Sequence, residues 1–155
     1  MNKNKKHKLN YIFLTLGLLG LLNSLYLSYA RYMHVDLPCS ITNGGCSVVA
    51  ASPYAVMFGM PLAYLGVLFY LTILGLGILY LFKSNIKYIK ETLLVVTTFG
   101  ALDSLYFLYL QGFVINAFCI YCILSAIISF CLLVVVYSLF VNQKSKILPT
   151  NNMSK

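Results

Sequence analysis

Four long apolar runs constrain the fold of this 155-residue chain more than any other feature. They begin near Tyr11, Leu62, Thr92 and Ile123, and each is close to the roughly 20 residues that an α-helix needs to cross a bilayer. Charged residues make up 9% of the chain, whereas soluble domains contain roughly 25%. Such a composition cannot cover a water-soluble surface. We therefore predict an all-α integral membrane protein, a four-transmembrane-helix bundle.

The runs predict one membrane domain over residues 10–141, between a basic, disordered arm (1–9) and a polar, disordered tail (142–155). The first run is longer than the 7–15 apolar residues of a secretory signal, so we expect an uncleaved helix. A loop over 31–60 joins the first two spans. The helices are expected at about 11–30, 61–82, 92–110 and 117–141, with a polar turn from Gln111 to Ala117.

Basic residues predict the orientation of the bundle. Ten of the eleven lie in the arm, in the loop near residues 83–90 or in the tail, and only Arg31 lies on the other face. Because cytoplasmic loops carry the excess of lysine and arginine, both termini are expected in the cytoplasm and residues 31–60 outside. The lysines flank apolar runs and are not interleaved with aromatic residues. We therefore predict a multi-pass cell-membrane protein that does not bind nucleic acid.

The predicted topology places four of the five cysteines on the outer side. Cys39 and Cys46 lie in the outer loop, and Cys119 and Cys122 open the fourth helix as a CxxC pair. Thiols pair in an oxidising compartment, and four cysteines allow three pairings. The sequence-local pairing gives two disulfides that could exchange electrons. The two crossed pairings would instead staple the outer loop to the fourth helix.

The CxxC spacing indicates redox chemistry. Residues three apart share one face of a helix, and a helix N-terminus favours a thiolate. Cys119 lies nearer the aqueous loop and Cys122 deeper in the membrane, so we expect Cys119 to exchange with the loop pair and Cys122 to meet a lipid-soluble acceptor. Cys131 lies nine residues further along on the opposite side of the helix and is interpreted as a packing residue.

Two other classes of protein remain as alternatives. A Cys-based metal-ion carrier or chaperone could use all four thiols, although the Cys39-x6-Cys46 spacing is unlike the short-spaced pairs of structural zinc sites. We predict no metal site. The other alternative is a non-enzymatic membrane adaptor held by structural disulfides.

Asp103 is the one charge expected deep in the membrane. A hydrogen bond to the first or fourth helix is its favoured role, and protonation of the lipid-soluble acceptor is the alternative.

Taken together, these motifs resemble the bacterial homologues of vitamin K epoxide reductase. The resemblance covers residues 11–141 and rests on the loop cysteines, Ser52-Pro53-Tyr54-Ala55, Phe58-Gly59-Met60-Pro61-Leu62 with Gly66, and Cys119-Ile120-Tyr121-Cys122. It implies a four-helix bundle around a quinone pocket. It also implies an enzyme that oxidises a thioredoxin-like partner and passes the electrons to menaquinone or ubiquinone.

The resemblance also implies residue roles. Cys122 would reduce the quinone and Cys119 would be its disulfide partner, with Cys39 and Cys46 as the shuttle pair. Of this pair, we expect Cys46 to meet the partner protein and Cys39 to meet Cys119. Ser52 would lie near the quinone headgroup, and the pocket lining is expected to include Phe58 and Phe118.

The chain departs from the family pattern in two respects. Vertebrate members contact vitamin K through a tyrosine one turn past the CxxC and an asparagine in the second helix. Ala126 and Leu62 stand at those places here, which favours ordinary quinone reduction over epoxide reduction. Many bacterial relatives carry a fused thioredoxin-like domain, whereas only a short tail follows here. The partner is therefore expected to be a separate extracytoplasmic protein.

Overall fold

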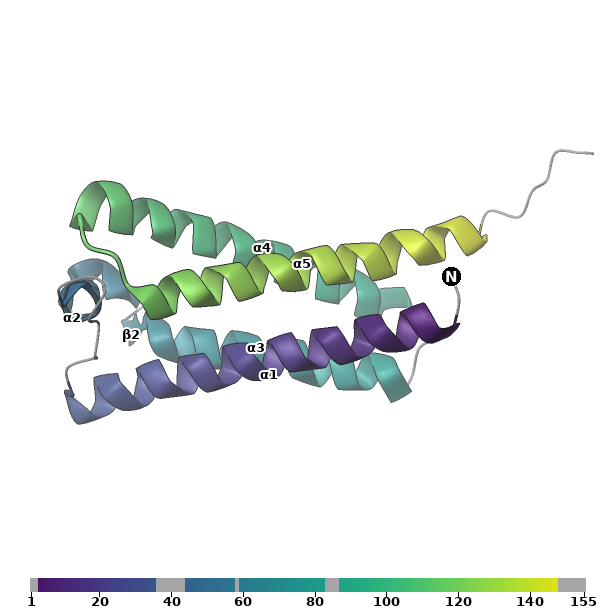
Figure 1. Ribbon diagram of the computed structural model, residues 1–155, viewed down its shortest axis with the longest axis horizontal. Coiled ribbons are helices and arrows are strands. Elements are labelled where there is room, and N and C mark those ends of the chain that lie inside the picture. Colours follow the sequence, from purple (N-terminus) through teal and green to yellow (C-terminus); the bar gives the residue numbers. More distant parts are fainter. Residues whose placement is uncertain (1–2, 36–43, 58, 83–86, 148–155) are drawn as a thin grey trace, which may run out of the picture.

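A computed structural model describes residues 3–35, 44–57, 59–82 and 87–147, and four long helices form most of it (Figure 1). They are α1 (Lys3–Met33), α3 (Leu62–Phe82), α4 (Lys87–Tyr109) and α5 (Ile120–Ile147). Within the described ranges, four segments are long and apolar enough to cross a membrane. These are Lys8–Met33, Leu62–Tyr80, Tyr88–Ile115 and Ile120–Val141. The predicted four-helix membrane bundle is confirmed.

The four helices pack lengthwise as a bundle. α1 packs against α3 and α5, and α4 packs against α5 and α3. α1 and α5 run side by side, and the N-terminus lies at the end of the bundle opposite α2 (Figure 1). We call the two ends the α2 end and the N-terminal end.

Short elements close the α2 end. They are α2 (Gly45–Ala51), the 3₁₀ turn η1 (Pro53–Ala55), strands β1 (Val56–Met57) and β2 (Met60–Pro61), and the π-helical turn η2 (Leu110–Ile115). The strands pair antiparallel, with Val56 opposite Pro61 and Met57 opposite Met60. Arg31, in the last turn of α1, donates a hydrogen bond of 2.6 Å from Nη1 to the carbonyl oxygen of Ala50. This contact ties α2 to the end of α1.

Three helices extend beyond their apolar runs. α1 begins at Lys3 and α5 continues to Ile147, so the prediction of disorder is wrong for residues 3–9 and 142–147. α4 begins at Lys87 instead of Thr92. Once a helix is nucleated, each added residue gains a backbone hydrogen bond, and lysine is a good helix former. Hydropathy marks the membrane-spanning part of a helix but not the end of its hydrogen bonding.

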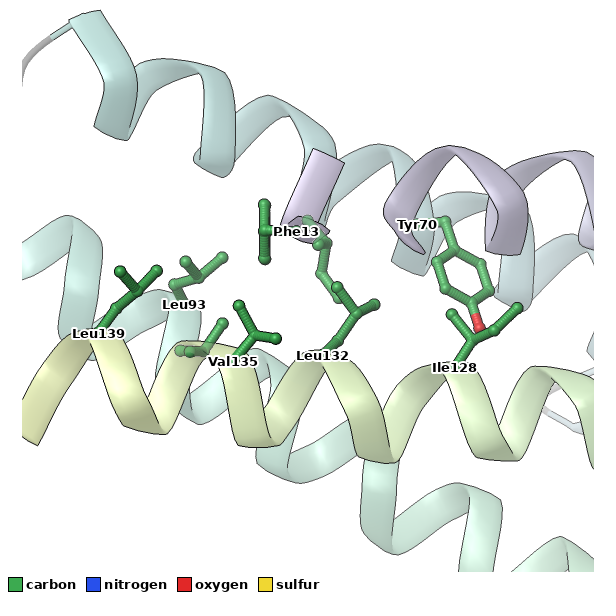
Figure 2. Packing of buried hydrophobic residues seen from close by; sticks show 9 residues of the cluster. Phe13, Tyr70, Leu93, Ile128, Leu132, Val135 and Leu139 are labelled. Atoms are coloured by element: carbon green, nitrogen blue, oxygen red, sulfur yellow. The ribbon is translucent and has the colours of Figure 1, made fainter. Parts of the chain in front are cut away.

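The interior of the bundle is an apolar cluster that also contains Tyr70 from α3. Phe13, Leu93 and Leu132 belong to this cluster, and Ile73 and Leu132 are fully buried. Figure 2 shows the Tyr70 hydroxyl pointing toward α5. There it lies 2.9 Å from the Ser125 hydroxyl and donates to the Ser125 carbonyl oxygen at 3.1 Å. The pairing satisfies a polar group that would be costly to bury alone.

A glycine on α1 makes room for the Tyr70 ring. A Cβ atom added at Gly20 would overlap Cε1 of the Tyr70 ring. Gly75 on α3 provides a contrast, because a Cβ atom added there would meet nothing within 4 Å. The two helical glycines therefore differ in packing while sharing the same backbone preference.

We predict that Gly20→Ala destabilises the bundle by about 1–3 kcal/mol, because the added methyl group displaces the Tyr70 ring from a filled interior. Gly75→Ala should be neutral or slightly stabilising, because alanine favours the helix by up to about 1 kcal/mol over glycine. Thermal unfolding in detergent would compare the two variants with the parent protein. Equal melting temperatures for both variants would contradict the packing argument.

Candidate functional site

A cavity of about 740 Å³ lies among the helices toward the α2 end. Ligand pockets in proteins typically measure about 300–1,000 Å³ and have apolar walls with a few polar groups. This cavity fits that description. Apolar side chains from α1, α3 and α4 form most of its wall, including Leu27, Leu62, Phe69, Phe99 and Phe107.

The α5 wall of the cavity carries the sulfur atoms. Cys119, Cys122, Ser125 and Ser129 line it, and their spacing places them along one face of the helix. Cys131 is free and exposed and is not among the lining residues, in keeping with its predicted place on another face. The face of α5 toward the cavity thus presents two thiols and then two hydroxyls.

Cys119 caps the N-terminus of α5 with its sulfur. Its carbonyl oxygen accepts the N–H of Ile123 at 3.0 Å, as the residue before a helix does. Its Sγ accepts the backbone N–H of Cys122 at 3.4 Å and the S–H of Cys122 at 2.8 Å. Both thiols are free. The first turn of α5 therefore holds the two sulfur atoms in direct contact.

Gln111, on the turn that precedes α5, holds the backbone of Cys119 in place. The sequence predicted a polar turn from Gln111, but this residue lies within the π-helical turn η2 and is 1% exposed. Its Oε1 accepts the backbone N–H of Cys119 at 2.9 Å. Asn116, with φ of 53°, then reverses the chain in the left-handed conformation that asparagine tolerates.

Sequence reasoning missed Gln111 as a site residue. A π-helical turn has no periodic signature, and such turns occur frequently at functional sites. The one available signal was a glutamine at the end of an apolar run, eight residues before the CxxC. Its Nε2 is buried and has no hydrogen-bond partner among the described residues, although Gln111 also lines the cavity.

The contacts around Cys119 favour its thiolate. The hydrogen bond from the Cys122 thiol, helped by backbone N–H groups of the first helical turn, lowers the pKa of Cys119 to about 7. Burial of the sulfur opposes this shift, because it disfavours the charged form. A thiol with this pKa is largely ionised at slightly alkaline pH. It is thus prepared for thiol–disulfide exchange, in which the thiolate is the nucleophile.

One loop cysteine reaches the same site. Cys46, on α2, is fully buried and disulfide-bonded, and it also lines the cavity. It belongs to the same buried cluster as Cys119, together with Ala30, Val49 and Phe107. Cys39 lies outside the described residues.

Three further predicted site residues do not join the cavity wall or cannot be placed. The Ser52 hydroxyl donates to the Val49 carbonyl oxygen at 2.8 Å, and Ser52 is not among the lining residues. Instead, this hydrogen bond caps the C-terminal end of α2. Phe118 is 48% exposed and also lies off the cavity wall, because it projects outward just before α5 begins. Phe58 lies outside the described residues.

The polar groups proposed around Asp103 are arranged differently from the expectation. Asn23 donates from Nδ2 to the carbonyl oxygen of Tyr121 at 3.1 Å, which ties α1 to the CxxC turn. Asp103 lines the cavity, and no hydrogen bond from its carboxyl group is found within the described part of the chain. The favoured structural hydrogen bond to α1 or α5 is therefore not present in this arrangement. Across the described residues, no three His, Cys, Asp or Glu side chains are grouped so as to hold a metal ion.

Comparison with known proteins identifies the class to which this fold and site belong. Residues 11–137 match the sequence profile of the vitamin K epoxide reductase family, and the chain belongs to that family. It is also 36% identical over 121 residues to the thiol-disulfide oxidoreductase LTO1 of Arabidopsis thaliana. That match covers 72% of this chain and 31% of the plant protein.

We predict that the reduced CxxC pair titrates with a midpoint near pH 7, because Cys122 donates to the Cys119 thiolate. In a Cys39→Ser/Cys46→Ser background, thiolate ultraviolet absorbance should rise through that pH. Adding Cys122→Ala removes the donor, so the midpoint should move up toward the ordinary thiol pKa of about 8.5. Adding Cys131→Ala instead should leave the midpoint unchanged. An identical midpoint with and without Cys122 would contradict the assignment.

Proposed function

We propose that this protein is a membrane thiol oxidoreductase that supports disulfide bond formation. Electrons would enter from a separate thioredoxin-like protein outside the cytoplasm and pass through Cys39 and Cys46 to Cys119 and Cys122. From there they would reach a quinone, menaquinone or ubiquinone, in the cavity. The observation that carries the proposal is the pair of contacting thiols of Cys119 and Cys122 on the wall of a large apolar cavity.

The cavity fits a quinone by its chemistry. Its apolar walls suit a ring with a lipid tail, and the polar groups that line it are few and lie on definite faces. Cys122 and Ser125 from α5, together with Gln111 and Asp103, are among these groups. A bound quinone would supply a two-electron, two-proton acceptor beside the dithiol. The positions matched to the family did not all identify residues of the cavity wall, since Ser52 and Phe118 do not line the cavity.

The redox states of the cysteines correspond to one stage of the proposed relay. Cys46 is in a disulfide, whereas Cys119 and Cys122 are free thiols. This is the stage at which the loop has been reoxidised and the electron pair resides on the CxxC. Forming the Cys119–Cys122 disulfide would then release two electrons and two protons to the acceptor.

The burial of Cys46 bears on the direction of the relay. The sequence favoured Cys46 as the cysteine that meets the partner protein. A fully buried sulfur is closed to an external dithiol, and Cys46 shares its buried cluster with Cys119. We therefore propose the reverse assignment, with Cys39 as its disulfide partner. In this scheme Cys39 meets the partner protein, and Cys46 exchanges with Cys119.

The charge distribution supports the orientation proposed from the sequence. Within the described ranges, eight of the nine basic residues lie on the parts of α1, α4 and α5 at the N-terminal end, and Arg31 lies at the α2 end. The positive-inside rule then places the N-terminal end in the cytoplasm and the cysteines on the extracytoplasmic side. A lumenal or extracellular thioredoxin-like protein could approach them there.

The proposed activity predicts quinone reduction by the purified protein with a reduced thioredoxin-like protein as donor. Cys119→Ala and Cys122→Ala should each abolish turnover, because neither can form the disulfide that releases the electron pair. Cys131→Ala should retain it, because that thiol is exposed away from the cavity. Quinone absorbance provides the measurement. No turnover with benzoquinones or naphthoquinones, together with stoichiometric bound metal, would favour the metal-carrier alternative.

The proposed relay also predicts which cysteines become linked. Cys39→Ser/Cys122→Ser leaves Cys46 and Cys119 as exchange partners, and we expect a Cys46–Cys119 disulfide to accumulate because the two share one buried cluster. Cys46→Ser/Cys122→Ser leaves Cys39 and Cys119 and serves as the matched control. Peptide mapping without reductant distinguishes the two products. Efficient linkage only in the control variant would restore the assignment made from the sequence.

A further inference from the structure

Asp103 is the acidic residue on the cavity wall, within the part of the chain that the structure describes. α4 presents a continuous face to the cavity at helical spacing, and Asp103 lies in the middle of that face, between Gly100 and Phe107. It also lies near the middle of the span Tyr88–Ile115, far from either end. An ionisable group at such a depth is unusual and indicates function.

Three other polar side chains on the cavity wall have hydrogen-bond partners for their hydroxyl groups. Ser104 donates to the Gly100 carbonyl oxygen and Thr72 donates to the Leu68 carbonyl oxygen, each at 2.8 Å. Tyr70 pairs with Ser125. Asp103 differs from them, because its half-buried carboxyl group has no hydrogen bond to any other described residue. Leaving a charge unpaired in apolar surroundings is costly, so this group is suited to exchange a proton with a bound molecule.

Asp103 lies farther from the α2 end of the bundle than the sulfur atoms of Cys119 and Cys122. Gln111 contacts Cys119 directly and lies eight residues after Asp103, or about 12 Å along an α-helix. Because α4 and α5 are antiparallel neighbours, Asp103 lies at the level between Ser125 and Ser129 on α5. The cavity thus has a thiol end and an acid end. A ring with two opposed carbonyl oxygens would present one oxygen to each.

The remaining titratable groups on the cavity wall lie elsewhere or have other roles. α1 contributes Arg31, which bonds Ala50, and His34 follows just after the end of α1. α3 contributes Tyr70, whose hydroxyl is paired, and α5 contributes Cys119 and Cys122. The disulfide at Cys46 does not titrate. Asp103 is therefore the carboxylic acid available to the far side of a molecule that contacts the thiols.

We propose that Asp103 is a catalytic residue that delivers a proton to the oxygen of the acceptor farther from the sulfurs; this rests on the proposed function. As the Cys119–Cys122 disulfide forms, the sulfurs lose two electrons and their two thiol protons. One proton passes to the nearer oxygen. Asp103 gives its carboxyl proton to the farther oxygen, and the second thiol proton restores the Asp103 carboxyl group. The sum is dithiol plus quinone giving disulfide plus quinol.

The test compares Asp103→Asn, which is nearly isosteric but holds no acidic proton, with Asp103→Glu and with Thr98→Val. The Thr98 hydroxyl lies on the same helix, is exposed and bonds only the Leu94 carbonyl oxygen, so it controls for loss of a polar group. The reduced protein is mixed with a short-chain benzoquinone or naphthoquinone. Alkylation at timed intervals follows loss of the Cys119 and Cys122 thiols, and quenching of tyrosine fluorescence measures quinone binding.

Asp103→Asn should bind either quinone about as tightly as the parent protein, while thiol oxidation slows at least about 100-fold, the contribution usual for a general acid. Its solvent deuterium isotope effect should rise. Asp103→Glu should recover part of the rate, and Thr98→Val should match the parent. An unchanged rate in Asp103→Asn, or binding and rate lost in parallel, would overturn the proposal. No thiol oxidation in the parent protein would instead overturn the proposed function, and this inference with it.

Discussion

The hydrogen bond from the Cys119 N–H to the Gln111 Oε1 joins the two halves of the site. It connects the end of the third spanning segment to the start of the fourth, across a reversal that Asn116 makes possible. In a bilayer, backbone groups outside regular helices must find partners within the protein. The glutamine side chain supplies that partner at the residue that also bears the reactive sulfur. The position of the sulfur therefore depends on a bond that serves the fold.

The same turn links structure to chemistry. With its backbone fixed, Cys119 can cap α5 with its sulfur and receive both donors of Cys122. These contacts, and not the polarity of the surroundings, favour the thiolate, since burial acts in the opposite direction. A CxxC in a regular helix interior would lack the free N–H groups of a first turn. Placing the pair at a helix start is thus a condition for the lowered pKa of Cys119.

Much of the fold could be predicted because the bilayer limits the possibilities to a few. Length and apolarity predicted the four spans, and the cysteine spacing predicted that Cys119 and Cys122 share one face of α5. The misses have a common physical cause. The ends of α1 and α5 depend on helix propagation, the role of Gln111 depends on a π-helical turn, and the positions of Ser52 and Phe118 depend on how short elements pack at the α2 end. None of these leaves a periodic pattern in the sequence.

The bond between Arg31 and Ala50 holds α2 against the end of α1, and Cys46 and Val49 on that helix are buried. Cys119 beneath them is only 2% exposed. The Cys119 sulfur is consequently shielded from small thiols dissolved in the surrounding water. In the proposed relay, α2 would therefore keep soluble thiols from exchanging with Cys119 except by way of the loop disulfide.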